Sequence, residues 1–139
     1  MPAGPALLAN LAATSALVGL IWVVEVAVYP LYARVGPESF VGYHAAWSGA
    51  ITLVVGPLML AEVAAGAWLF TQRPKLALGA AVPVAVAWAA TAFWAVPMHA
   101  KLDAGFVVTA WNSLLWANHV RTAAWTARGA LLAWAALKA

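Results

Sequence analysis

Four apolar stretches, each near the roughly 20 residues that a membrane-spanning helix needs, dominate the 139-residue sequence. They cover about residues 8–32, 45–70, 76–98 and 119–137. Hydrophobic residues make up 66% of the chain, against only seven Lys or Arg and four Asp or Glu. So low a charge content is typical of membrane proteins. The sequence therefore predicts an all-α fold, a single integral membrane four-helix bundle in contact with the lipid bilayer.

Composition also excludes several classes of protein. The charged residues are too few and too scattered for a basic patch, so we expect no nucleic acid partner. Cysteine is absent, which removes disulfides, thiolate metal sites and a cysteine nucleophile. The first apolar stretch is much longer than the roughly 7–15 residues of a signal-peptide core, so we expect it to be retained as a membrane span.

Four spans would place the first and third loops on one membrane face and the second loop, with both termini, on the other. The second loop carries Arg73 and Lys75, and the positive-inside rule favours the cytoplasm for it. We therefore predict a bacterial inner membrane protein with both termini in the cytoplasm. Residues 104–118 are amphipathic, and the sequence leaves open whether they form a short interfacial helix or extend the fourth span.

Two opposite charges are expected at the same depth in the bilayer. Glu62 lies nine residues before Thr71, near the end of the second span, which is a rise of about 14 Å. Arg128 lies ten residues before Lys138, a rise of about 15 Å. Both positions fall near the middle of a hydrocarbon layer of roughly 30 Å, where an unpaired charge is costly. We predict that the two side chains face the bundle interior and form an ion pair.

Helical periodicity places further polar residues on this interior face. His44 precedes Glu62 by eighteen residues, which is five whole turns, and Arg121 precedes Arg128 by seven, which is close to two. His119 is nine residues from Arg128 and therefore about half a turn round the helix. We expect His119 to point outward, toward the lipid interface.

The inward polar side chains are the predicted functional residues, because an ionisable group inside a membrane is a functional candidate by default. The predicted catalytic residues are His99, Glu62, Arg121, Arg128 and Asn118. Imidazole and carboxylate ligands suit iron, copper or zinc, so a transition metal is a predicted cofactor. Its predicted ligands are His44, His99, Glu25 and Glu62. Two plainer interpretations stay open: histidines favour membrane interfaces, and a buried ion pair can serve only to fix helix register.

Aromatic side chains gather toward the end of the predicted bundle that also carries the histidines. An interfacial belt accounts for aromatic residues at both ends of a span. Their asymmetry favours an aromatic-lined pocket that opens at one face. The aromatic residues on this side are Tyr29, Tyr32, Phe40, Tyr43, Trp47, Trp94, Trp111 and Trp116.

Two short segments, VPMHAKLDAG at 96–105 and LLWANHVRT at 114–122, resemble the anthrone-oxygenase-like membrane proteins of bacteria and fungi. That family has a Pro-x-Asn-x-x-Leu-like motif after its third span and a Trp-x-x-Asn-x-x-Arg-like motif at the start of its fourth. His99 stands where the family usually has asparagine. The resemblance implies a four-helix membrane protein, some relatives of which oxygenate aromatic polyketides. The matching residues are Pro97, Leu102, Asn118 and Arg121, and Trp116 lies one position closer to Asn118 than the motif has its tryptophan.

The sequence predicts an integral-membrane oxidoreductase or oxygenase for a small hydrophobic, aromatic or quinone-like substrate. In this hypothesis His99 and His44 act as general base or metal ligands, Glu62 and Glu25 act as ligands or proton relays, and arginines stabilise a substrate anion. A non-enzymatic binding or transport module, including a haem protein with an axial histidine, is the alternative. A purely structural subunit is a third hypothesis, and the apolar faces of so small a bundle also favour a homo-oligomer.

Overall fold

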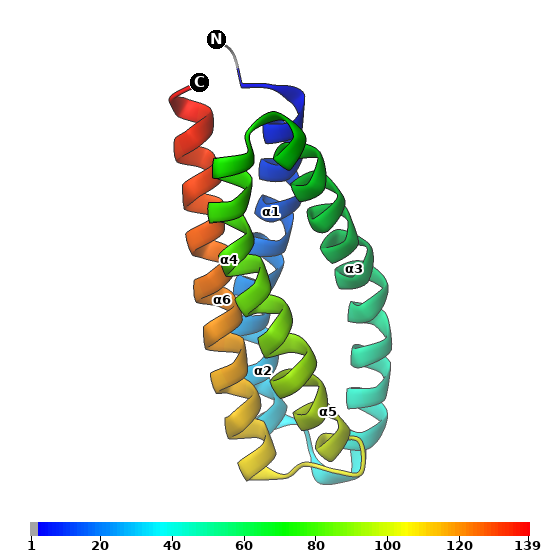
Figure 1. Cartoon of the computed structure of the whole chain (residues 1–139). Coiled ribbons are helices and arrows are strands. Elements are labelled where there is room, and N and C mark those ends of the chain that lie inside the picture. The colour runs from blue at the N-terminus through cyan, green and yellow to red at the C-terminus, as the bar shows by residue number, and fades with distance from the viewer. Residues whose placement is uncertain (1–2) are drawn as a thin grey trace.

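Helices account for nearly all of residues 3–139, the part of the chain that the computed structural model describes (Figure 1). This part of the chain forms a four-helix bundle without β-strands, as the sequence predicted. The elements in chain order are α1 (Pro5–Val23), the π-helical η1 (Val24–Val28), α2 (Tyr29–Leu31), the 3-10 helix η2 (Tyr32–Arg34), α3 (Pro37–Gln72), α4 (Pro74–Ala90), the π-helical η3 (Thr91–Ala95), α5 (Val96–Leu102) and α6 (Val108–Leu137).

Three helical segments are long and apolar enough to cross a membrane: Pro5–Arg34, Pro37–Gln72 and Pro74–Leu102. Their outer faces carry bare hydrophobic side chains, such as Leu53 at 79% exposure, which suit contact with lipid acyl chains. The chain is thus a helical membrane bundle. α6 is less apolar than these three segments, and it buries four of its polar residues, Asn118, Arg121, Thr122 and Arg128.

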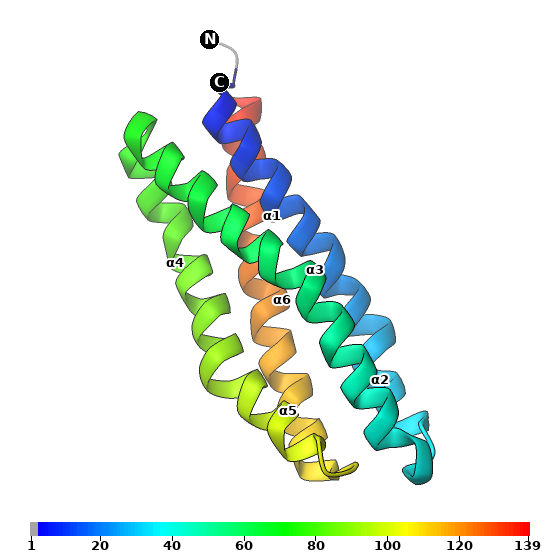
Figure 2. The ribbon, with the colours of Figure 1, turned by 90° about the vertical axis from the view of Figure 1, so that its right-hand side faces the viewer.

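Each helix packs against two neighbours in a closed ring, α1 with α3, α3 with α4, α4 with α6 and α6 with α1. The start of α1, the end of α6 and the α3–α4 turn lie at one end of the bundle (Figures 1 and 2). We call this the terminal end. The connections at residues 35–36 and 103–107 lie at the other, which we call the distal end.

The helices run further than the predicted spans. α3 begins at Pro37, eight residues before the predicted start of the second span at about residue 45. α6 is continuous from Val108, so residues 108–118 extend the fourth helix rather than form a separate interfacial one. Gly105, in the preceding connection, has a φ of +146°, a conformation that residues with a Cβ rarely adopt.

Two π-helical turns, η1 and η3, lie at the level of the site described below. Each ends two residues before a proline, η1 before Pro30 and η3 before Pro97. Proline lacks a backbone N–H and its ring crowds the carbonyl four residues earlier, and a wider turn accommodates both effects. Proline alone does not dictate the turn, since Pro57 and Pro83 lie inside regular α-helix.

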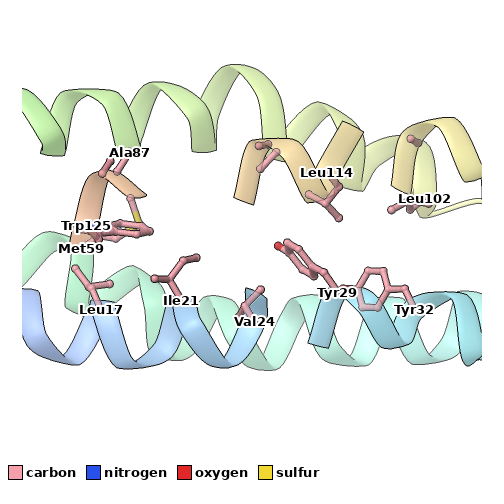
Figure 3. Packing of buried hydrophobic residues seen from close by; sticks show 14 of the residues in the cluster. Leu17, Ile21, Val24, Tyr29, Tyr32, Met59, Ala87, Leu102, Leu114 and Trp125 are labelled. Atoms are coloured by element: carbon pink, nitrogen blue, oxygen red, sulfur yellow. The ribbon is translucent and has the colours of Figure 1, made fainter. Parts of the chain in front are cut away.

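The larger of two buried hydrophobic clusters fills the middle and distal parts of the bundle. Figure 3 shows Leu17, Ile21 and Val24 in a row along one side of this cluster, with Trp125 facing them. Tyr29 and Tyr32 continue the row toward the distal end, and the Tyr29 hydroxyl points toward the bundle interior (Figure 3).

Candidate functional site

The predicted ion pair between Glu62 and Arg128 is present near the middle of α3 and α6. Arg128 Nε lies 3.0 Å from Glu62 Oε1, and both side chains are buried. The Thr14 hydroxyl lies 3.2 Å from the same carboxylate oxygen, and the Trp125 indole N–H donates to Oε2 at 3.1 Å. Two helices, α1 and α6, therefore supply partners to this carboxylate, which α3 carries.

The Arg128 guanidinium is equally well satisfied. Besides Glu62, its hydrogens go to the Thr14 hydroxyl, the backbone carbonyl of Ala80 and the side-chain oxygen of Asn10. A cavity of about 280 Å³ between α3 and α4 borders this cluster. Each of the three guanidinium nitrogens has a partner, so Arg128 connects α1, α3 and α4 to α6.

A chain of four side chains lies toward the distal end, three of them joined by hydrogen bonds and the fourth at ion-pair distance. The Tyr29 hydroxyl is 2.8 Å from His99 Nε2, and His99 Nδ1 is 2.9 Å from His44 Nε2. Asp103 Oδ1 lies 3.1 Å from His44 Nδ1, at ion-pair distance but off the axis of a straight hydrogen bond. His44 is fully buried, whereas the Asp103 side chain is 65% exposed, so the chain runs from the interior to the surface.

One arrangement of hydrogens satisfies the whole chain when Asp103 is ionised. His44 then carries its hydrogen on Nδ1, facing the carboxylate, and accepts at Nε2 from His99 Nδ1–H. His99 in turn accepts at Nε2 from the Tyr29 hydroxyl. The carboxylate thus orders the tautomers of both imidazoles, as the acid of a catalytic triad orders its histidine.

Aromatic rings enclose this chain, which agrees with the aromatic clustering expected at this end. His99 stacks on Trp47 at a centroid distance of 6.0 Å, and His44 stacks on Phe40 at 5.6 Å. Tyr32 packs edge-on against His44 and is fully buried. The rings hold both imidazoles in place and keep water from most of their surface.

A cavity of about 440 Å³ adjoins the histidine chain inside the distal half of the bundle. This volume lies within the usual range for small-molecule sites. Its walls are mostly aliphatic and aromatic, with Tyr29, His99 and Asp103 among the polar exceptions. Exposed residues of α3 and α5 also line it, Thr52 and Ala100 among them, so the cavity reaches the lateral surface between those two helices.

Arg121 contributes a positive charge to the same cavity wall. Its side chain is 6% exposed, and its guanidinium carbon lies 5.6 Å from the centroid of the Trp125 ring. Within residues 3–139, Arg121 Nε has no hydrogen-bond partner and no carboxylate pairs with the side chain. Arg121 and Arg128 share one face of α6, as predicted, yet their surroundings differ completely.

A third polar cluster lies between η1 and α6, outside the cavity. Glu25 accepts hydrogen bonds from Asn118 Nδ2 at 2.6 Å and from the Thr122 hydroxyl at 3.1 Å, and it contacts His119 Nδ1. The His119 side chain is 46% exposed, in keeping with its predicted outward position. The sequence did not reveal its pairing with Glu25, which the wide turn of η1 helps to orient.

The predicted site residues thus separate into three groups. Eighteen residues, or about 27 Å of helix, divide His44 from Glu62 although they share a face of α3. Glu25 and Asn118 belong to the cluster between η1 and α6, so the four predicted metal ligands do not converge. Among residues 3–139, no three His, Asp or Glu side chains are arranged to hold a metal ion.

The fold and these clusters define a helical membrane bundle with an internal, laterally open cavity bordered by a histidine pair. Comparisons with known protein families, curated proteins and solved structures find no match to this chain. The arrangement of its own residues therefore carries the functional argument.

Proposed function

We propose that the chain is an integral-membrane oxidoreductase or oxygenase that takes up a small aromatic or quinone-like molecule and begins its oxidation by removing a proton. The observation that carries this proposal is the Tyr29–His99–His44–Asp103 chain, which leads from the cavity wall to an exposed carboxylate. A base next to an apolar cavity is what proton removal from a hydrophobic substrate requires.

In the proposed reaction His99 is the general base, acting directly or through the Tyr29 hydroxyl. The positive charge that develops on His99 is stabilised through His44 by Asp103. Because Asp103 is exposed at the distal end, the proton has a route to water along the same chain. Arg121 stabilises the anion that remains on the substrate.

The oxidant in the oxygenase form of the proposal is dioxygen. A substrate CH₂ group loses a proton to the base, and the carbanion reacts with dioxygen. Loss of water then leaves a carbonyl group in place of the CH₂. One oxygen atom stays in the product and the other leaves as water, so the reaction balances without a further reductant. The resemblance of residues 96–105 and 114–122 to anthrone-oxygenase-like proteins supports this form.

A metal-dependent form with iron, copper or zinc needs ligands that the histidine pair does not offer in the present arrangement. Each of the four ring nitrogens of His44 and His99 already faces a partner: Asp103, the other histidine or Tyr29. We therefore assign the proton transfer to the side chains themselves. Elemental analysis of detergent-purified protein tests the metal-dependent form directly.

A second candidate function is binding or transport of a small molecule without chemical change. The unpaired charge of Arg121 beside the cavity favours this candidate. A haem-binding variant would show a Soret band in protein expressed with a haem supply. The proposal further places the chain in a bacterial inner membrane, with Arg73 and Lys75 at the cytoplasmic terminal end, and allows for a homo-oligomer.

Turnover of a panel of anthrones, phenols and quinols by proteoliposomes tests the proposed function. Oxygen uptake and product mass are measured for wild type, His99→Ala and the matched control His119→Ala. We expect His99→Ala to lose about 10²- to 10⁴-fold in rate, and His119→Ala to keep wild-type activity. Equal rates for all three proteins, or no turnover of any compound, contradict the proposal.

A further inference from the structure

The two buried arginines of α6 have opposite surroundings although they are seven residues apart on one helix face. Arg128 pairs with Glu62 and donates to three further oxygens. Arg121 is almost as deeply buried, but its Nε lacks a partner within residues 3–139. The bundle therefore neutralises one guanidinium and leaves the other facing a cavity.

No carboxylate of residues 3–139 pairs with Arg121, although Asp103 lines the same cavity. Glu62 is committed to Arg128, and Glu25 accepts from α6 outside the cavity. Asp103 lies at the far end of the histidine chain, beside His44. Within residues 3–139, the carboxylates that form ion pairs do so with His44, His119 and Arg128, and none pairs with Arg121.

A charge taken out of water without a counter-ion is costly in a membrane interior. The Trp125 ring beneath the guanidinium offsets only part of that cost. An anionic group on the bound molecule would offset much of the remaining cost and accept a hydrogen bond from the free Nε–H of Arg121. The rest of the cavity wall is mostly apolar and includes the rings of Trp47 and Tyr29, which suits a flat aromatic molecule.

We propose that the cavity binds an aromatic hydroxyl compound as its phenolate, with Arg121 as the counter-ion. The proton leaves the aromatic hydroxyl for the His99 end of the histidine chain, so one O–H bond breaks and one N–H bond forms. This inference rests on the proposed function, because it assigns the substrate class of the same cavity. The inference adds to the proposed function that the negative charge lies on an oxygen of the bound substrate before any oxidation.

The test uses 7-hydroxycoumarin, whose phenol and phenolate forms have separate excitation bands, and 7-methoxycoumarin, which cannot ionise. Both compounds are titrated into purified protein at a pH below the midpoint of 7-hydroxycoumarin in empty micelles. The variants are Arg121→Met, which keeps much of the side-chain volume, and Arg34→Met, which removes an exposed arginine at the distal end. Thermal unfolding of each variant is recorded in parallel.

We expect wild type and Arg34→Met to raise the phenolate-to-phenol ratio at least about tenfold over micelles, and to bind the methoxy compound at least about tenfold more weakly. Arg121→Met should return the ratio to within about twofold of micelles. It should also unfold at no lower temperature than wild type, because it removes an uncompensated charge. Absence of the raised ratio in wild type, or its persistence in Arg121→Met, overturns the inference.

The two proposals fail in different ways. Phenolate binding without turnover of any substrate leaves the inference standing and contradicts the proposed enzyme. Turnover of an aromatic substrate without a raised phenolate-to-phenol ratio supports the proposed enzyme and contradicts the inference of phenolate binding.

Discussion

Replacing Glu62 with glutamine should destabilise the protein strongly, because it leaves Arg128 as a buried charge without its counter-ion. The pair is separated by 3.0 Å, and neither side chain has appreciable access to solvent. Loss of one member of such a pair costs about 3–5 kcal/mol, which corresponds to a factor of more than 10² in the unfolding equilibrium constant. The neutral partners of Arg128, Thr14 and Asn10, cannot supply the missing charge.

A double-mutant cycle separates this effect from simple loss of packing. We expect Glu62→Gln and Arg128→Gln each to be destabilising, and the double variant to lose only about 1–2 kcal/mol, since two neutral amides can hydrogen-bond where the ions stood. Unfolding by SDS titration, followed by tryptophan fluorescence, measures all four proteins. If the loss in the double variant equals the sum of the two single losses, the buried pair is not coupled and the reasoning is refuted.

Three further predictions concern other parts of the bundle. Thr52→Trp, at the lateral opening of the cavity, should weaken ligand binding about tenfold or more, because the larger side chain overfills the cavity. Leu53→Trp, on the adjacent lipid face, should leave binding unchanged. Calorimetric titration with 7-hydroxycoumarin distinguishes the two variants. Glu25→Leu should lower the free energy of unfolding by about 2–4 kcal/mol, because Asn118 and Thr122 lose their hydrogen-bond acceptor. His119→Ala should lower it by less than about 1 kcal/mol, because that ring is half exposed. SDS titration of both variants measures the two losses, and equal losses contradict the prediction. Elemental analysis of the purified protein should find less than about one metal ion per ten chains, because no three His, Asp or Glu side chains of residues 3–139 are arranged to hold a metal ion. One iron, copper or zinc ion per chain contradicts this assignment.

The ion pair could be predicted from sequence because it depends on only two quantities, depth along a helix and angle around it. Both follow from the fixed rise and turn of an α-helix. The same arithmetic placed Arg121 on the face of Arg128 and His119 on another side. These positions are confirmed, since Arg121 and Arg128 are buried and His119 is half exposed.

The grouping of residues into sites could not be predicted in this way. Face periodicity alone put His44 and Glu62 in one constellation, although about 27 Å of helix separates them. The position of Glu25 depends on a π-helical turn, which changes the angle that a regular helix would give. Asp103 lies between the third and fourth predicted spans, and only the three-dimensional fold of the α5–α6 connection brings it beside His44.

The partners of the ion pair were missed for a different reason. Thr14 and Asn10 lie in an apolar span as isolated polar residues, and such residues occur in many membrane helices without a specific role. Their contacts with Glu62 and Arg128 depend on how closely α1 approaches α6. Gly129 marks that approach, because a Cβ there would lie 3.3 Å from the Val18 side chain.

The central claim, that the histidine chain removes a proton from a molecule in the cavity, is tested most directly without any oxidant. Proteoliposomes are incubated anaerobically in D₂O with an anthrone, and deuterium incorporation at its acidic CH₂ group is followed by mass spectrometry. Wild type and His119→Ala should accelerate exchange over empty liposomes, and His99→Ala should lose about 10²- to 10⁴-fold of that rate. Exchange no faster than in empty liposomes, or equally fast in His99→Ala, contradicts the account.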